Sequence, residues 1–254
     1  MPKPTAFHTS WERDSEWYDD LLGKSGTYQE EVVLPNLMRM LELTRGMQVI
    51  DIACGPGYFS RAMAAVGAKV HGIDASRSFI DTANGAGGGS EYAVGDAAKL
   101  TGVAGALYDR ATMVLAIQNI EPAAAAFAEA ARVLKKNGRL LVVMNHPAFR
   151  IPKHSDWGWD GEKVQYRRED RYLSELKEKI QTHPGSDPDR FTLSFHRPLQ
   201  FYVKALAKAG FAVTRLEEWT SNRSSQPGPR AEAENRARAE FPLFMAIEAR
   251  KING

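Results

Sequence analysis

The apolar residues of this chain fall into short continuous runs that alternate with longer stretches of helical periodicity. The runs occupy residues 49–53, 69–73, 91–94, 109–115 and 139–145. Apolar runs of this length, bounded by glycine and polar turns, are typical of buried strands. Because strands that alternate with helices build a parallel sheet covered on both faces, the pattern predicts a doubly wound α/β domain.

Helical patterns surround these runs. The predicted helices span residues 11–22, 27–43, 58–66, 122–136, 198–209 and 231–240. Two late strands, at residues 211–219 and 241–250, extend the sheet. Glycine-rich residues 84–90 and polar residues 221–230 have the composition of loops.

Residues 146–197 follow neither pattern and are rich in Trp, Tyr, Arg and His. They begin where the fifth strand ends, and the parallel strands all end at the same edge of the sheet. We therefore predict that they form an insertion that roofs a ligand site at that edge. The expected organisation is one domain with four parts: N-terminal helices in residues 1–45, a core in 46–145, a cap in 146–197 and the rest of the sheet in 198–254.

The most informative stretch is Asp51-Ile52-Ala53-Cys54-Gly55-Pro56-Gly57, where the first strand ends in a glycine turn that opens into a helix. Such a turn aims backbone N–H groups and the positive end of a helix at a ligand. A triphosphate loop needs Lys followed by Ser or Thr, which are absent here, and a dinucleotide fold has a third glycine where this chain has Ser60. A carboxylate at Asp51 repels a pyrophosphate and attracts a sulfonium, so the turn suits a cationic ligand.

Asp74 carries a second signal, because it ends the second strand about twenty residues beyond the glycine turn. An acidic residue at this place accepts hydrogen bonds from a ribose diol. NAD-binding proteins share the feature, so Asp74 predicts an adenosine ligand without choosing the cofactor. The same side chain can also cap the next helix.

Together these motifs resemble the class I S-adenosylmethionine-dependent methyltransferases, whose first motif is an acidic residue on strand one followed by a G-x-G turn. The resemblance covers residues 28–145 and, loosely, the final strand. It implies a Rossmann-like seven-stranded sheet with an antiparallel last strand beside the sixth, and S-adenosyl-L-methionine as the cofactor. Residues 116–122 are similar to the small-molecule and quinone methyltransferases, and they lack the D/N-P-P-Y sequence of many enzymes that act on base or glutamine nitrogens.

The resemblance also implies roles for individual residues. Asp96 would accept from the adenine amine, Tyr28 and Gln29 would reach the carboxylate end of the cofactor, and the end of strand four would border its methionine part. The expected cofactor contacts are Tyr28, Gln29, Asp51, Ala53, Gly55, Gly57, Asp74, Ala75, Asp96, Ala97, Leu115 and Ala116.

The acceptor site is predicted on the N-terminal helices and the cap, where aromatics can wall an apolar acceptor and arginines can pair with an anionic group on it. The candidates, for each of which a packing role is the alternative, are Trp17, Tyr18, Asn119, Phe149, Arg150, Trp157, Trp159 and Tyr172. Methyl transfer from a sulfonium needs correct placement and no covalent nucleophile, but an acceptor oxygen or amine can require a general base. His146 is the first candidate base, followed by His196 and Glu121.

Composition and net charge narrow the expected partners, metal sites and location of the protein. The net charge of +2 gives no general case for nucleic acid, and a single cysteine, Cys54, excludes an internal disulfide and a cysteine-based zinc site, so no metal is expected. Residues 1–5 lack the apolar region of a secretory signal, and no run has the length of a membrane span, so we expect a cytoplasmic protein. The expected oligomeric state is a monomer or a homodimer.

Methyl transfer to a small-molecule acceptor is the leading hypothesis for the function. An RNA or protein methyltransferase stays open because arginines recur in the cap and in residues 223–238. A non-catalytic cofactor-binding protein and an NAD-dependent oxidoreductase are further alternatives. Asp51 and Ser60 argue against the binding of NAD. The lack of a recognisable Tyr-x-x-x-Lys catalytic pair also argues against an NAD-dependent oxidoreductase.

Overall fold

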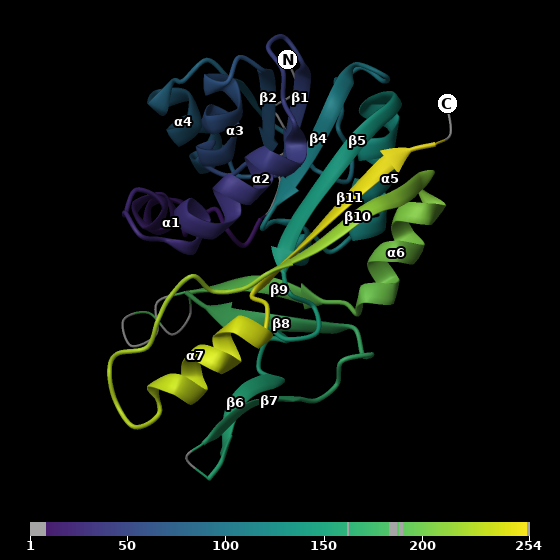
Figure 1. The fold of residues 1–254 in the computed structure, drawn as a ribbon. Coiled ribbons are helices and arrows are strands. Elements are labelled where there is room, and N and C mark those ends of the chain that lie inside the picture. The colour runs from purple at the N-terminus through teal and green to yellow at the C-terminus, as the bar shows by residue number, and fades with distance from the viewer. Residues whose placement is uncertain (1–8, 162, 183–186, 188–189, 253–254) are drawn as a thin grey trace.

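The apolar runs of the sequence form one mixed sheet (Figure 1), in a computed structural model that describes residues 9–161, 163–182, 187 and 190–252. Its order is β10-β11-β5-β4-β1-β2-β3, and β1 to β5 are parallel. The last strand is antiparallel to both neighbours and lies between β5 and β10, which confirms the predicted fold class. The strands are β1 (Gln48–Ile52), β2 (Lys69–Asp74), β3 (Glu91–Val94), β4 (Tyr108–Val114), β5 (Leu134–Asn145), β10 (Phe211–Trp219) and β11 (Phe244–Lys251).

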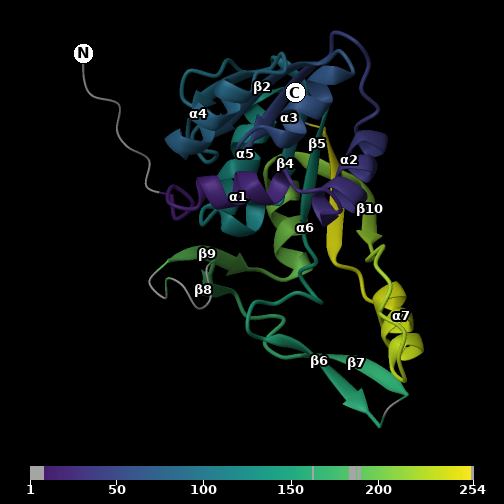
Figure 2. The same cartoon turned by 90° about the vertical axis from the view of Figure 1, so that its left-hand side faces the viewer.

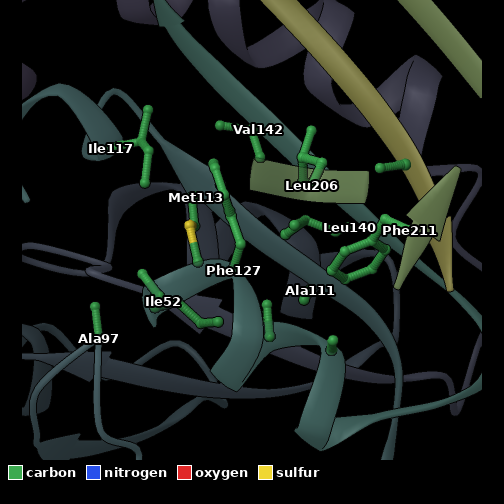
Figure 3. Close-up of a cluster of buried hydrophobic side chains, with 14 of the residues drawn as sticks. Ile52, Ala97, Ala111, Met113, Ile117, Phe127, Leu140, Val142, Leu206 and Phe211 are labelled. Atoms are coloured by element: carbon green, nitrogen blue, oxygen red, sulfur yellow. The ribbon is translucent and has the colours of Figure 1, made fainter. Parts of the chain in front are cut away.

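Each face of the sheet has its own apolar core, because successive side chains of a strand point to opposite faces. On one face α5 (Ala123–Val133) and α6 (Leu199–Lys208) pack on Ile50 and Ile52 of β1. Figure 3 shows this cluster, with Phe127 and Leu206 among the strand residues. The helices of the other face are the π-helical turn Gln29–Val33, α2 (Leu34–Leu41) and α3 (Tyr58–Ala65).

Three predicted boundaries differ from the structure. The helix predicted to reach residue 136 ends at Val133, because fully buried Leu134 already pairs with Tyr108 in the sheet. Asn137, with φ 63°, therefore lies within β5, where the pairing register shifts. The predicted loop at residues 84–90 begins later, because α4 (Arg77–Ala86) continues through the first three of these residues.

The N-terminal helices are also shorter than predicted. Only α1 (Ser15–Leu22) is helical within residues 11–22, and residues 10–13 form a turn before it. The second helix ends at Leu41, where Glu42 takes a left-handed conformation. Residues 1–8, on which the expectation about a signal segment rests, lie outside the described residues.

The predicted cap contains two antiparallel hairpins. They are formed by β6 (Ser155–Asp160) with β7 (Val164–Glu169) and by β8 (Leu176–Gln181) with β9 (Phe191–His196). In both views the hairpins lie beyond the arrowhead of β5, at the carboxyl edge of the sheet (Figures 1 and 2). The β6–β7 hairpin contacts α7 (Ala231–Glu240). None of the helices within the described ranges has the length and apolar character needed to cross a bilayer.

A buried carboxylate ties the sheet to its helical layer. Asp51 is 1% exposed and points to the α3 face, one residue before the end of β1. Its carboxylate accepts hydrogen bonds from Ser60 Oγ of α3 at 2.5 Å and from Thr112 Oγ1 of β4 at 2.7 Å. Burial raises the pKa of Asp51 to about 6, although both hydroxyl hydrogen bonds act to lower it.

This pKa predicts how stability depends on pH. The carboxyl group of Asp51 titrates near pH 6 in the folded chain and near pH 4 in the unfolded chain, so its contribution to stability falls as the pH rises between these values. In Asp51→Asn this loss is absent. We therefore expect the unfolding free energy of the variant, relative to the native chain, to rise by about 2–3 kcal/mol between pH 4 and pH 7. Urea denaturation across this range measures it.

The exposed residue Asp20 provides the control, because Asp20→Asn changes the same functional group at the surface. Its stability difference from the native chain should be nearly constant with pH. A constant difference for Asp51→Asn as well would contradict the account of the buried carboxylate.

Candidate active site

A cavity of about 370 Å³ opens at the carboxyl edge of the sheet. Its floor is made by the turns that follow β1, β2, β3 and β4, because parallel strands bring these turns to one edge. The N-terminal segment and β9 supply the remaining walls through Trp11, Tyr18, Leu193 and Phe195. A volume of this size is within the range of small-molecule sites, about 300–1,000 Å³.

Two residues at the floor of the cavity that are not glycine have a left-handed backbone conformation. Ala53, after β1, has φ 59°, and Leu115, after β4, has φ 54°. Such conformations cost about 1–3 kcal/mol and concentrate at ligand sites. The N–H of Leu115 donates to the carbonyl of Val143 at 2.7 Å, which helps to hold the turn. Both residues line the cavity, as predicted for cofactor contacts.

The glycine turn fixes an acidic side chain. Gly55 has φ 55°, and its N–H donates to Asp74 Oδ2 at 2.9 Å. The N–H of Ser76 donates to Asp74 Oδ1 at 2.8 Å. The Gly55 amide is therefore used within the protein, whereas the sequence suggested that it would face a ligand.

Asp74 remains able to accept further hydrogen bonds. A carboxylate has about four acceptor positions, and the two backbone donors use one on each oxygen. Burial raises the pKa of Asp74 to about 6, so the group is ionised at neutral pH. The side chain lines the cavity at the end of β2.

Asp96 offers a second acceptor at the end of β3. Its Oδ1 accepts from the N–H of Ala98 at 2.8 Å, which orients the carboxylate beside the cavity. Among the described residues no donor is bonded to its Oδ2. Asp96 can therefore accept from an amine of a bound ligand.

The charge of the lining selects among ligands. Among the described residues it contains three carboxylates, those of Asp74, Asp96 and Glu121, and no Lys, Arg or His. This arrangement suits a ligand with positive charge and hydrogen-bond donors, and it disfavours a pyrophosphate. S-adenosylmethionine has a sulfonium, a ribose diol and an adenine amine, so the residues present fit this cofactor.

The structure brings many predicted site residues together, because they lie on the converging turns. The predicted cofactor contacts that line the cavity are Ala53, Gly55, Asp74, Ala75, Asp96, Ala97, Leu115 and Ala116. Of the other predicted residues, Tyr18, Asn119 and Glu121 line it too. Not part of the lining are Tyr28, Gln29, Asp51, Gly57, Trp17, Phe149, Arg150, Trp157, Trp159, Tyr172, His146 and His196.

His146 does not have the environment of a general base. Its Nε2 lies 2.7 Å from Glu218 Oε1, and its Nδ1 accepts from the N–H groups of Ala148 and Phe149. Burial lowers the pKa of the ring. Both nitrogens are thus used to hold the corner after β5, and the ring is not part of the cavity lining, so its catalytic role stays a prediction without support from this geometry.

His196 is similarly engaged. It is buried on β9, and its Nε2 donates to the carbonyl of Tyr172 at 2.8 Å. The side chains of β9 alternate between the two faces of the hairpin, so Phe195 lines the cavity and His196 does not. Its catalytic role likewise stays a prediction that this geometry does not support.

Near the N-terminus, two predicted cofactor contacts bond within the protein. The hydroxyl of Tyr28 is 2.9 Å from Ser221 Oγ, and the Arg223 guanidinium stacks on its ring. Gln29 forms a side-chain hydrogen bond with Tyr18, whose pKa is raised to about 12 by burial. Gln29 is thus bonded to a residue of the cavity lining without being part of the lining itself.

The aromatic residues of the cap pack against arginines and against one another. Arg167 stacks on Trp157 with 5.0 Å to the ring centroid, and Arg230 stacks on Trp159 with 4.7 Å. These contacts are the ones expected if Trp157 and Trp159 have a packing role.

The remaining predicted acceptor residues of the cap are engaged in the same way. Phe149 stacks on the ring of His146, and Arg150 donates to Asn145 Oδ1. The hydroxyl of Tyr172 accepts from the N–H of Leu199. Trp17 lies beside Tyr18 on α1, with 6.4 Å between the ring centroids.

Part of the cavity wall was not predicted from the sequence. Leu193 and Phe195 line it from β9, Trp11 lines it from the turn before α1, and Phe79 lines it from α4. For β9 a signal exists, because residues 191–196 alternate apolar and polar as a half-buried strand does. For Trp11 there is none, since residues 10–13 fold back as a turn that the helical pattern concealed.

Comparison with known proteins agrees with this geometry. Residues 50–142 match the profile of a family described as a methyltransferase domain, which spans β1 to β5 and therefore the floor of the cavity. A search among curated proteins gives no significant match.

Solved structures share the fold across most of the chain. An S-adenosylmethionine-dependent methyltransferase from Mesorhizobium loti is 26% identical, with a TM-score of 0.69 over 89% of this chain and 98% of its own. A Listeria monocytogenes protein assigned to the same class is 24% identical, with a TM-score of 0.64 over 84% and 97%. The Haloferax volcanii protein solved in complex with the Trm112 methyltransferase activator is 14% identical, with a TM-score of 0.67 over 97% and 99%.

None of these matches addresses the predicted likeness to the quinone methyltransferases. They do agree on the seven-stranded fold, on the segment that builds the cavity floor and on the class of enzyme. Residues 50–142 are therefore a methyltransferase domain, in a chain with the fold of the class I S-adenosylmethionine-dependent methyltransferases.

Proposed function

We propose that this cavity binds S-adenosylmethionine and a small-molecule acceptor, and that the chain transfers the methyl group by in-line displacement. The observation that carries the proposal is the pair of oriented carboxylates, Asp74 and Asp96, in a cavity whose described lining residues include no cation. Residues 46–145 would hold the cofactor, and the cap of residues 146–197 would close the acceptor side.

Individual residues would divide the cofactor among them. Asp74 would accept from the ribose hydroxyls, and Asp96 from the adenine amine, since each has free acceptor positions. The left-handed turns at Ala53 and Leu115 would border the methionine part, because they lie on the central strands β1 and β4. Asp51 would act indirectly, by fixing β1 and α3 beneath the turn.

The bound cofactor supplies a methyl group on a sulfonium, which is a good leaving group. The chain therefore needs only to orient an acceptor and to exclude water. Asn119, Glu121 and Phe195 line the same cavity as the end of β4, so they are well situated to contact the acceptor. Because cofactor and acceptor share about 370 Å³, the acceptor should be small.

Of the three predicted bases only Glu121 lines the cavity. Lys177 Nζ lies 2.9 Å from its Oε1 and also over the ring of Phe195. Both charged groups are more than half exposed, so an acceptor can replace the lysine at a small cost. Glu121 is therefore the residue that we propose as the base for acceptors that must lose a proton.

The cofactor assignment predicts the effect of Asp96→Asn. Asparagine keeps an oxygen for the N–H of Ala98, but its amide nitrogen cannot accept from the adenine amine. We expect the Kd for S-adenosylhomocysteine to rise about 10- to 100-fold in calorimetry, since a hydrogen bond to a charged group contributes about 1.5–3 kcal/mol. Exposed Asp81 supplies the control variant Asp81→Asn. Equal affinity of both variants would refute the adenine position.

The acceptor class can be tested with a panel of small phenols, amines and thiols. We expect at least one of them to release S-adenosylhomocysteine from S-adenosylmethionine at ten or more times the rate without acceptor. RNA and a mixture of unfolded proteins should give no release above that background. Release with RNA or protein alone would show that the small-acceptor proposal is wrong.

The proposed base predicts the behaviour of Glu121→Gln with an acceptor that must lose a proton. The amide cannot take the proton, so kcat should fall at least tenfold while the Kd for the cofactor is unchanged. Glu91→Gln changes an exposed glutamate of β3 outside the cavity and should retain full activity. An undiminished kcat in Glu121→Gln would remove this residue from the mechanism.

A further inference from the structure

The ammonium group of Lys177 contacts two residues of the cavity wall at once. Lys177 lies on β8, and its Nζ is 2.9 Å from Glu121 Oε1 and 5.3 Å from the centroid of the Phe195 ring. Glu121 and Phe195 line the cavity, whereas Lys177 does not. A carboxylate and an aromatic face both attract an ammonium ion. The contacts of Lys177 therefore show that one positively charged nitrogen can use this pair of residues together.

Buried Arg197 fixes these two residues relative to each other. Its Nη2 donates to the carbonyl oxygens of Ile120, at 3.0 Å, and of Glu121, at 2.6 Å. Its guanidinium also lies over the Phe195 ring, 5.4 Å from the centroid. Only 4% of Arg197 is exposed, so solvent does not compete for these contacts. The backbone of Glu121 and the ring on β9 are thus positioned by the protein itself.

The carboxylate of Glu121 stays available to a ligand. Arg197 bonds to the carbonyl oxygen of Glu121, and its own Nε faces Glu175 Oε2 at 3.9 Å. Among the described residues, Lys177 is the cation that pairs with the Glu121 carboxylate. Both side chains of this pair are more than half exposed, and exposed ion pairs contribute little to stability. A ligand ammonium can therefore displace Lys177 at a small cost.

Asn119 adds a neutral oxygen to the same wall. Its Nδ2 donates to the carbonyl of Leu115 at 3.4 Å, and within the described ranges no donor is bonded to its Oδ1. An ammonium group has several N–H donors, so it can bond to Asn119 and Glu121 together. A phenol or a thiol has one donor and no positive charge, and would leave one of these oxygens unused.

The charge of the cavity favours the same class of acceptor. The charged residues in the described part of the lining are Asp74, Asp96 and Glu121, all of them acidic. An acceptor with a carboxylate or a phosphate would be repelled there, whereas a positively charged amine would be attracted.

We propose that the methyl acceptor is a small aliphatic amine, whose ammonium group binds to Glu121 and Phe195 in place of Lys177 Nζ. This inference rests on the proposed function, because it names the class of acceptor for the same cavity. Arg197 is then a positioning residue of the acceptor site. Lys177 is an internal competitor that the acceptor must displace.

The proposed reaction is balanced. The bound ammonium gives one proton to the Glu121 carboxylate, which frees the lone pair of the nitrogen. This lone pair forms the new bond to the methyl carbon, and the electron pair of the broken S–C bond stays on sulfur. The products are the N-methylated ammonium ion, neutral S-adenosylhomocysteine and a protonated Glu121, which returns its proton to solvent.

Binding of a probe amine tests the proposal without turnover. The complex of the native chain with S-adenosylhomocysteine is titrated in a calorimeter at pH 7 with propylamine, which is then an ammonium ion. The control ligand is 1-propanol, which has the same carbon chain and no charge. We expect propylamine to bind more tightly by about tenfold or more, because the carboxylate and the ring act on its charge. Equal affinity of the two probes, or no binding of propylamine, would overturn the proposal.

Removing the competing ammonium group should strengthen binding. Lys177→Met keeps an unbranched side chain and removes the charge, so the Kd for propylamine should fall about two- to fivefold, as expected for loss of a competing exposed ion pair. A variant that only disturbed the hairpin would not bind the amine more tightly. An unchanged Kd would contradict the proposed position of the ammonium.

The matched control is Lys179→Met, on the same strand. Lys179 Nζ lies 4.2 Å from the centroid of the Phe191 ring, and neither of these two residues lines the cavity. The Kd for propylamine should therefore be unchanged in this variant. An equal fall in both variants would show that the effect comes from net charge and would overturn the assigned position.

The outcomes separate this inference from the proposed function. Release of S-adenosylhomocysteine with a phenol or a thiol, and none with amines, would overturn the amine proposal and leave methyl transfer to a small acceptor intact. Failure of the native chain to bind S-adenosylhomocysteine would instead overturn the proposed function.

Discussion

The candidate site depends above all on the hydrogen bond from the Gly55 amide to the Asp74 carboxylate. This bond joins the turn after β1 to the end of β2, and it requires the left-handed backbone that Gly55 adopts. It orients a carboxylate that burial would otherwise destabilise, as the raised pKa of Asp74 shows. Without it, the turn and the acidic side chain would have no fixed relation, and the floor of the cavity would be undefined.

The other buried carboxylate, Asp51 on β1, performs a different task. It uses its oxygens on Ser60 and Thr112, so it connects β1, β4 and α3 beneath the cavity. The two acidic residues at the ends of β1 and β2 therefore differ in role. Asp51 joins the layers below the turn, and Asp74 faces the cavity.

The walls above this floor come from segments that are distant in sequence. Residues 9–14 and the β8–β9 hairpin meet through the Ser10–Leu193 and Asp14–Arg190 contacts. The β6–β7 hairpin, by contrast, packs on α7 and leaves its tryptophans to intramolecular arginines.

Sequence reasoning succeeded where a local pattern determines position. Asp74 and Asp96 were found because the apolar runs locate the strand ends, and parallel pairing then brings those ends together. It failed where contacts between residues that are distant in the sequence determine the structure. Leu134 joins β5 by pairing with Tyr108 despite the helix-ending Asn137-Gly138, and His146 is bonded to Glu218 from β10, which no local pattern indicates. Trp11 was not predicted as part of the cavity wall, because residues 11–13, which were predicted as helical, form a turn.

The central claim is that the cavity binds S-adenosylmethionine. Calorimetric titration of the native chain with S-adenosylmethionine, S-adenosylhomocysteine and NAD tests it most directly. The account predicts micromolar affinity for the first two and no detectable binding of NAD, because the carboxylate lining repels a pyrophosphate. Binding of NAD alone would contradict the assignment of the ligand, although the fold would stand.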